Sequence, residues 1–223
     1  MAIEFDNTDD YLTWALPASL TRPFTIGCWV NHDGTQGTIV EINQAIGTKI
    51  AAVRIDSTNH AECAFGAAGA IVATDPSTLS NGWHYLAGWC DDTQGAGSDT
   101  AVLYVDGVLV DSTVGTEAST GSMARITVGA AKSGLDPYGG AVAEVAVWYD
   151  LNGDVLAEMS PQFTDNFFTK EVAHTEPIDL QFFARHISTN CLTEFVSRAT
   201  ATITSAPVDV AHQRIITHYR NYV

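Results

Sequence analysis

The sequence feature that most constrains the fold is the recurrence of apolar residues at every second position. Phe24, Ile26, Cys28 and Val30 share one side of an extended chain, and residues 83–90 repeat the pattern with aromatic side chains. Successive side chains of a β-strand point to opposite faces of the sheet. The alternation therefore predicts strands that each turn one face toward a core.

Turn residues separate the predicted strands. Asp106 and Gly107 stand between the β-rich runs 101–105 and 108–110. Asp-Gly at such a place is a strong hairpin signal, because both residues tolerate positive φ. Strands and turns at this spacing indicate a β-sandwich or a barrel. Further strands are predicted at 38–43, 49–56, 61–65, 70–74, 125–129 and 141–149.

The charge balance restricts the possible partners. Of 223 residues, 26 are acidic and 10 are basic, which gives a net charge of −16. Phosphate contacts require clustered Lys and Arg, so we expect no nucleic-acid partner. No apolar run approaches the roughly 18 residues that span a membrane. The first residues resemble no secretory signal, so we expect synthesis in the cytoplasm.

The four cysteines are scattered along the chain at Cys28, Cys63, Cys90 and Cys191. They lack the close pairing that zinc sites show. In a reducing compartment such residues are buried thiols more often than disulfides. We therefore predict free, buried thiols.

After residue 150 the sequence predicts one short helix and two strands. Asn152 can cap a short helix that ends before Pro161. Residues 178–184 and 201–204 are predicted strands. We predict one domain over residues 1–204.

Residues 205–223 are predicted to form a C-terminal arm, which ends in an acid-free stretch with two Arg and two His. Two interpretations stay open: a final strand with a frayed end, or an arm that docks on an acidic surface of this chain or of a neighbour. The residues expected to make assembly contacts are Arg214, Ile215, Ile216, Tyr219, Arg220 and Tyr222.

Six segments carry a family resemblance in their order along residues 1–160. They are 3–12 with Phe-Asp and Asp-Asp-Tyr, 24–30 with Phe-Thr-Ile and Trp-Val, 82–87 with Trp-His, 103–108 with Leu-Tyr-Val-Asp-Gly, 126–130, and 140–148 with Glu-Val-Ala-Val-Trp. In this order they resemble the laminin-G-like, pentraxin-like branch of the concanavalin A-like jelly rolls. The resemblance implies an all-β sandwich of two antiparallel sheets, with residues 3–12 as its opening strand.

Calcium is common in the family that the sequence resembles. Asp6 and Asp10 are the candidate metal ligands of this chain. Ala143, however, stands where relatives carry an acid that helps to hold the cation. We therefore predict no cofactor, with Ca²⁺ at Asp6 and Asp10 as the one candidate.

The same fold hosts glycoside hydrolases, which need two carboxylates about 5–9 Å apart. On the strand that carries Glu144, the next acid of the same parity is Asp150, roughly 20 Å away along a strand. We therefore predict no enzymatic activity. Tyr138, in the loop before this strand, is the candidate for an exposed ligand-binding aromatic. The alternation around His84 and around the tryptophans favours structural roles for them.

These observations predict a non-catalytic structural or interaction protein of a viral particle, such as a capsid decoration, fibre or tail component. After residue 160 the sequence looks like the tail that some phage relatives carry behind this jelly roll. The expected location is the virion, and the expected partners are other virion proteins or further copies of the chain. The alternative is a carbohydrate-binding, lectin-like module that binds surface glycans.

Overall fold

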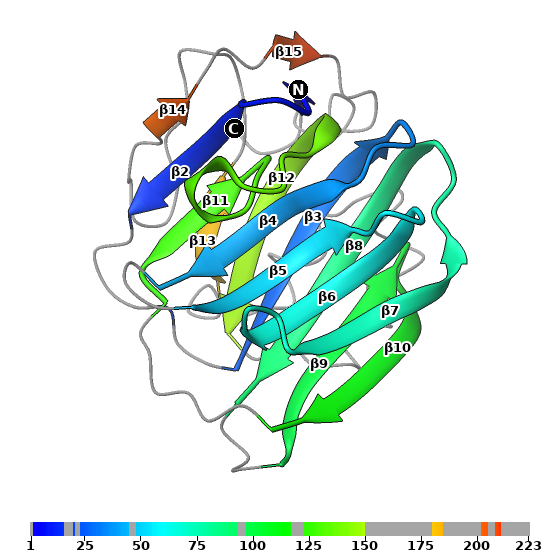
Figure 1. Ribbon diagram of the computed structural model, residues 1–223, viewed down its shortest axis with the longest axis vertical. Helices are drawn as coiled ribbons and strands as arrows, with labels where there is room; N and C mark the ends of the chain where they lie inside the picture. Colours follow the sequence, from blue (N-terminus) through cyan, green and yellow to red (C-terminus); the bar gives the residue numbers. More distant parts are fainter. Residues whose placement is uncertain are drawn as a thin grey trace, which may run out of the picture.

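The architecture is a sandwich of two antiparallel sheets (Figure 1). A computed structural model describes residues 2–15, 20, 23–44, 48–92, 97–116, 123–149, 180–184, 202–204 and 208–210. The all-β prediction is confirmed. Among the described residues the helical content is one 3₁₀ turn, Lys132–Gly134. None of the helices in these ranges has the length and apolarity to cross a membrane.

The first sheet, sheet A, has the strand order β10-β9-β8-β3-β12-β1-β15, and β13 pairs with β12 beside β1. Its strands are β1 (Ala2–Asp6), β3 (Phe24–His32), β8 (Gly82–Asp91), β9 (Asp99–Val105), β10 (Val108–Gly115), β12 (Gly139–Tyr149), β13 (Leu180–Ala184) and β15 (Val208–Val210).

The second sheet, sheet B, has the order β14-β2-β11-β4-β5-β6-β7. Its strands are β2 (Tyr11–Ala15), β4 (Gly37–Asn43), β5 (Lys49–Ile55), β6 (His60–Ala67), β7 (Ile71–Thr78), β11 (Arg125–Val128) and β14 (Thr202–Thr204). Figure 1 shows β4, β5 and β6 lying over β3 and β8 of sheet A, with which they enclose the core.

The core lies between the sheets and contains the alternating residues that the sequence pattern selects. Phe24, Ile26, Cys28 and Val30 are fully buried there, as predicted. Val145 of β12 is buried there as well, and Val105 of β9 is half-buried against the same cluster.

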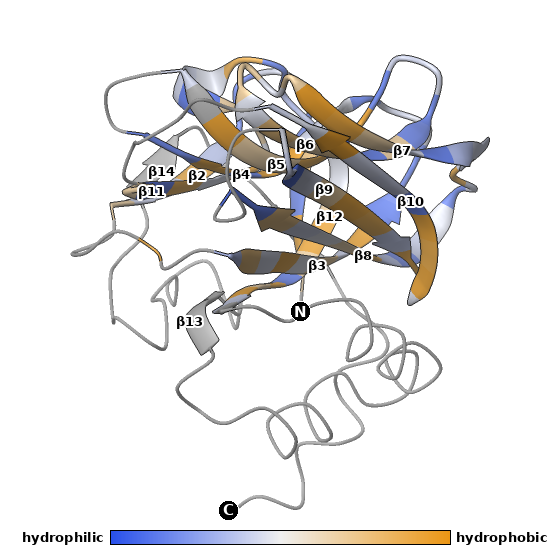
Figure 2. Ribbon diagram, turned by 90° about the horizontal axis from the view of Figure 1, so that it is seen from below, coloured by the Kyte–Doolittle hydropathy of each residue, from blue (hydrophilic) through white to orange (hydrophobic). Residues whose placement is uncertain are grey.

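The outer face of sheet A is also apolar. Trp29, Tyr85 and Trp148 form a second buried cluster with alanines of β8 and β12, and the rings of Trp29 and Tyr85 meet edge to face at 5.5 Å. Figure 2 shows hydrophobic bands along the strands of this sheet. This two-sided burial confirms the structural interpretation for Trp29 and Trp148. Trp89 is half-buried on the same face.

One predicted element is wrong. Residues 3–12 are not a single opening strand but two strands in different sheets, β1 in sheet A and β2 in sheet B. Between them Asn7 adopts a φ of 61°, which turns the chain through a corner. Asn tolerates this left-handed conformation better than most residues.

The chain after residue 149 is described in three short strands. β13 and β14 confirm the predicted strands at 178–184 and 201–204. β15 pairs with β1, so sheet A extends into the segment that we predict to be an arm. The predicted helix after Asn152 lies outside the described residues.

Candidate functional site

The corner between β1 and β2 brings three carboxylates together. Oxygens of Asp6, Asp9 and Asp10 all lie within 4.8 Å of one another. Asp6 also accepts a hydrogen bond from the Thr8 amide at 2.9 Å, which tightens the turn. The side chains of Asp6 and Asp9 are exposed, whereas Asp10 is buried. The structure thus unites the two predicted metal ligands and adds Asp9.

This donor set fits a hard cation. Three carboxylates at such short separation repel one another, and a divalent ion relieves that repulsion. Calcium takes six to eight oxygen ligands, so backbone carbonyls and water would complete the shell. Asp6, Asp9 and Asp10 are the residues that would hold it. The sequence signal for Asp9 was its position in the Asp9–Asp10 pair.

Tyr138 is not the exposed aromatic that we expected. Its side chain is fully buried, and its hydroxyl donates to the backbone carbonyl of Asn31 at 3.4 Å. The loop folds back onto the sandwich because the Tyr138 amide bonds to the Gly129 carbonyl at 2.9 Å. Burial raises the pKa of the phenol. A ring held in this way cannot stack on a ligand without loop opening.

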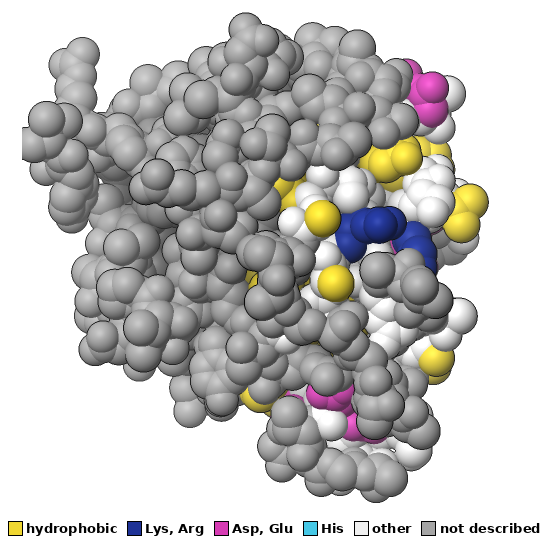
Figure 3. Space-filling model, turned by 90° about the vertical axis from the view of Figure 1, so that its left-hand side faces the viewer, with side chains coloured by type: hydrophobic (Ala, Val, Ile, Leu, Met, Phe, Trp, Pro, Cys, Tyr) yellow, Lys and Arg dark blue, Asp and Glu magenta, His cyan; other side chains and the backbone are white. Residues whose placement is uncertain are grey.

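The same loop covers part of the outer face of sheet B. The amide of Lys132 donates to Glu41 at 2.9 Å, and its ammonium donates to the Gln44 carbonyl at 3.0 Å. Burial raises the pKa of Glu41, and the hydrogen bonds from the Lys132 amide and the Asn43 side chain oppose that effect. Arg125 pairs in register with Asn43 at the same end of β4. Figure 3 shows the basic side chains visible on this side of the molecule gathered in one small group.

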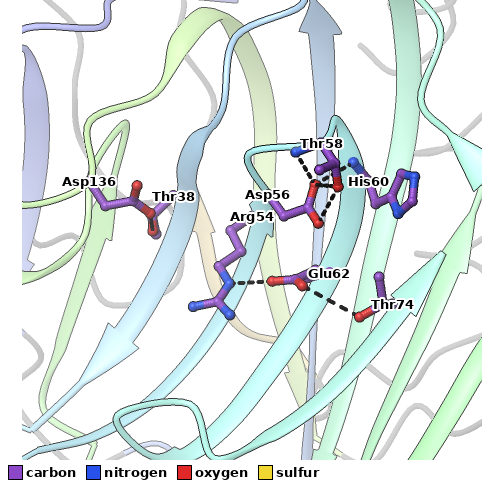
Figure 4. A network of polar contacts seen from close by, with 8 residues as sticks. All are labelled: Thr38, Arg54, Asp56, Thr58, His60, Glu62, Thr74 and Asp136. Atoms are coloured by element: carbon purple, nitrogen blue, oxygen red, sulfur yellow. Dashed lines mark hydrogen bonds and ion pairs between the residues drawn. The ribbon is translucent and has the colours of Figure 1, made fainter. Parts of the chain in front are cut away.

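Further along sheet B, the outer face carries a polar row across three strands (Figure 4). Arg54 of β5 contacts Glu62 of β6 at 2.6 Å, and the hydroxyl of Thr74 of β7 contacts Glu62 at 3.4 Å. Nearby, Asp56 accepts from the amides of Thr58 and His60 at 2.8 Å each. Burial alone would raise the pKa of Asp56, but these hydrogen bonds together lower it. Such cross-strand pairs align neighbouring strands.

Glu144 does not lie in an open cleft. It is 3% exposed and has a φ of 50° at a β-bulge, where the pairing of β12 with β3 shifts register. A bulge of this kind changes the direction of the side chain relative to the regular strand. Asp150, its only partner by parity in the sequence, lies outside the described residues.

His84 has a structural environment, as we predicted. Its Nδ1 lies 2.7 Å from the carboxylate of Asp106, and its Nε2 lies 3.0 Å from the hydroxyl and from the carbonyl of Ser80. The second oxygen of Asp106 accepts from the Tyr85 amide at 2.8 Å. Asp106 therefore ties the β9–β10 hairpin turn to β8. The hydrogen bond to Asp106 raises the pKa of His84.

The terminal strand β10 carries a feature that the sequence pattern does not identify. Val108, Leu109 and Val114 are 61%, 53% and 60% exposed. Within the described residues β10 pairs with β9 alone, so its other edge has no strand neighbour there. Asp111 turns its carboxylate to the Thr74 amide of β7 at 2.8 Å, which joins the edges of the two sheets.

The predicted assembly residues of the C-terminal arm lie outside the described residues. They are Arg214, Ile215, Ile216, Tyr219, Arg220 and Tyr222. The strand that precedes them, β15, ends at Val210 beside Ala2 of β1.

Two facing antiparallel sheets define a β-sandwich of the jelly-roll class. The chain belongs to the concanavalin A-like lectin/glucanases superfamily, whose laminin-G-like family matches residues 6–151. The predicted resemblance is thereby confirmed.

Solved structures share the fold at low sequence identity. A heptameric SAP-like pentraxin from Limulus polyphemus superposes with a TM-score of 0.56 at 14% identity, covering 71% of this chain and 81% of the pentraxin. A Trypanosoma rangeli sialidase in complex with sialic acid gives 0.52 at 16% identity, over 73% of this chain and 28% of the sialidase. No curated protein matches the chain in sequence.

Proposed function

We propose that this chain is a non-catalytic interaction protein that assembles with neighbouring subunits on a viral particle, as a capsid decoration, fibre or tail component. The observation that carries the assembly role is the exposed apolar edge strand β10. A free strand edge offers unpaired amides and carbonyls to an incoming strand. Protected edges carry charged residues, Pro or a bulge, and β10 has a bulge between Leu109 and Asp111 and a single charged residue, Asp111, which is bonded to β7.

The side chains of this edge suit a protein partner. Leu109 and Val114 lie opposite Tyr104 and Thr100 in the β9–β10 register, so both lie on the outer face of sheet A. Both side chains are already about half-buried, so covering the remainder contributes roughly 1 kcal/mol each. A net charge of −16 opposes contact between copies, so salt should strengthen self-association. The pentraxin of similar fold is described as heptameric, which supports self-assembly as one mode.

The C-terminal arm is the second proposed contact. Its two arginines and two histidines follow a strongly acidic body, and opposite potentials steer encounters between proteins. Because β15 pairs with β1, the arm that can reach a neighbour begins after Val210. The viral setting is supported by the resemblance of the chain after residue 160 to phage relatives. Mass spectrometry of purified particles tests that location directly.

The absence of catalysis is the third part of the proposal. Glycosidases place two carboxylates about 5–9 Å apart around an accessible bond. Glu144, the acid of the strand β12, is 3% exposed. We expect no turnover of β-glucans, galactans or chitin oligomers. Turnover that disappears in Glu144→Gln would contradict this part of the proposal.

The assembly role is tested by sedimentation of the purified protein at several concentrations. We expect an oligomer that Leu109→Lys combined with Val114→Lys converts to monomer, with little change in melting temperature. Leu135→Lys is the matched control, because Leu135 is 68% exposed but lies in the loop after β11. A wild-type chain that stays monomeric at tens of micromolar, or an oligomer that both variants leave intact, would contradict self-assembly through β10.

Carbohydrate binding is the alternative function. It is favoured by the superfamily and by the partly exposed rings of Trp83 and Trp89 on sheet A, since sugars stack on aromatic faces. A glycan array with the wild-type chain tests it. Binding that survives the β10 substitutions but is lost in Trp89→Ala would favour the lectin-like function over assembly.

A further inference from the structure

Two cysteine thiols meet across the core of the sandwich. Cys63 lies on β6 of sheet B and Cys90 on β8 of sheet A, and both are buried. Their sulfur atoms are 3.8 Å apart. Cys28 is also a buried thiol, and burial raises its pKa. The prediction of free, buried thiols is thus confirmed for these three, and Cys191 lies outside the described residues.

The two strands approach closely at this point because β8 has a glycine there. A Cβ atom built on Gly88 would lie 2.6 Å from the sulfur of Cys63 and 3.2 Å from its Cβ. Sheets packed through ordinary side chains are about 10 Å apart. Gly88 lies two residues before Cys90, on the same face of β8, and its missing side chain leaves the space that Cys63 occupies.

Each cysteine has one small cross-strand neighbour, whereas the neighbour on its other side is larger, Val53 beside Cys63 and Phe24 beside Cys90. Ala73 lies opposite Cys63 in the β6–β7 register, and Ala101 lies opposite Cys90 in the β8–β9 register. Both alanines are fully buried. Small neighbours leave the sulfur atoms room to rotate toward each other, from 3.8 Å to the roughly 2.05 Å of a disulfide bond.

We propose that Cys63 and Cys90 form a disulfide that joins the two sheets when the chain folds in the presence of a disulfide oxidant such as oxidised glutathione. One cysteine thiolate attacks the oxidant, forms a mixed disulfide and releases one reduced glutathione. The second thiolate then attacks the protein sulfur of that mixed disulfide and releases another. Two protein thiols are oxidised, one glutathione disulfide is reduced, and the two thiol protons end on the released glutathiones.

Burial determines when this bond forms. Glutathione cannot reach thiols that are 0% and 1% exposed, so the exchange takes place during folding or through opening of the sandwich. The bond closes a loop with a sequence separation of 27 residues and connects β6 to β8 across the core. Such a cross-link restricts the unfolded chain and stabilises the native state.

The test is to refold the full chain from denaturant either in a glutathione redox buffer or in excess dithiothreitol. Remaining thiols are then alkylated under denaturing conditions, and the peptides are mapped by mass spectrometry. We expect a linked Cys63–Cys90 peptide pair and an alkylated Cys28. The oxidised protein should melt roughly 5–10 °C higher than the reduced protein.

Each variant is compared with itself in the two buffers, so a change in its basal stability does not enter the result. Cys28→Ala should keep the link and the gain in melting temperature. Cys63→Ala and Cys90→Ala should lose both. The proposal is overturned if Cys63 and Cys90 are recovered alkylated, if either links to Cys28 or Cys191 instead, or if the oxidised protein melts below the reduced one. The wild-type peptide map decides this even if a variant does not fold.

Discussion

At the level of single residues, two histidines near one end of sheet A meet opposite electrostatic conditions. His84 faces the carboxylate of Asp106, which raises its pKa, and Asp75 acts in the same direction. His32 is 2% exposed, its ring nitrogens meet no hydrogen-bond partner among the described residues, and burial lowers its pKa. Protonation of the imidazole ring therefore stabilises the fold at His84 and destabilises it at His32.

The raised pKa of His84 predicts a pH dependence of stability. A base whose folded pKa exceeds its unfolded value of 6.5 contributes fully below pH 6.5, and loses that contribution as pH rises through the folded pKa. We therefore expect the free energy of unfolding to fall as the pH rises above 6.5 through the folded pKa of His84, on the opposite side of 6.5 from the lowered pKa of His32. Urea unfolding at several pH values measures it.

The matched variant is His84→Gln, which keeps a hydrogen-bonding side chain but cannot become charged. It should lose about 1 kcal/mol of stability at pH 6 and show a flatter profile above pH 6.5. A wild-type profile without a decline in that range, or an equal slope in the variant, would show that the Asp106 contact does not favour the charged imidazole.

At the level of elements, connections between strands decide which segments can approach each other. The start of β4 packs against the loop 129–139, where the Thr38 amide donates to the Asp136 carbonyl at 3.0 Å and the Thr38 hydroxyl donates to the Asp136 carboxylate at 2.7 Å. Gly37 permits this approach. Its φ is 137°, and a Cβ atom there would collide with the backbone of Pro137.

Substitution of Gly37 by alanine should therefore be strongly destabilising, by about 3 kcal/mol, because backbone strain and a backbone clash act together. Gly82→Ala is the control. Gly82 has a similar φ of 122°, but nothing lies within 4 Å of its built Cβ atom. It should cost about 1 kcal/mol from strain alone. If Gly37→Ala and Gly82→Ala lower the free energy of unfolding in denaturant by the same amount, the loop moves away from the added Cβ atom at no cost.

At the level of the whole molecule, the corner between β1 and β2 connects the two sheets and carries the acidic cluster. An ion bound by Asp6, Asp9 and Asp10 would contact the end of a sheet A strand and the residue before a sheet B strand. Because the unfolded chain does not hold these carboxylates together, binding would add to global stability.

Although the sequence alone predicts no cofactor, the three gathered carboxylates lead us to propose that saturating Ca²⁺ stabilises the protein by about 1–3 kcal/mol relative to a chelator, measured as a rise in melting temperature. Asp10→Asn should abolish the response. Asp33→Asn should retain it, because Asp33 is an exposed turn residue outside the cluster, bonded to Thr35. Identical melting temperatures in calcium and in chelator would show that the corner does not bind the cation.

The sequence by itself determined the positions of most strands and the hairpin at Asp106–Gly107. Alternation at Phe24–Val30 and the Asp106–Gly107 turn depend on neighbours two to four residues apart, so the local chain contains the information. The same holds for the pairing of the predicted metal ligands, since Asp6 and Asp10 are separated by one turn. The six ordered segments of residues 1–160 sufficed to identify the family.

Only the tertiary structure decided which residues meet across the sandwich. The burial of Tyr138 depends on a loop folding onto β3, and the bulge at Glu144 depends on the register of β12 with β3. The exposure of β10 follows from its place at the end of a sheet, and the contact of Cys63 with Cys90 follows from the glycine that brings the sheets together. Each depends on packing between strands distant in sequence, which alternation along one strand cannot specify.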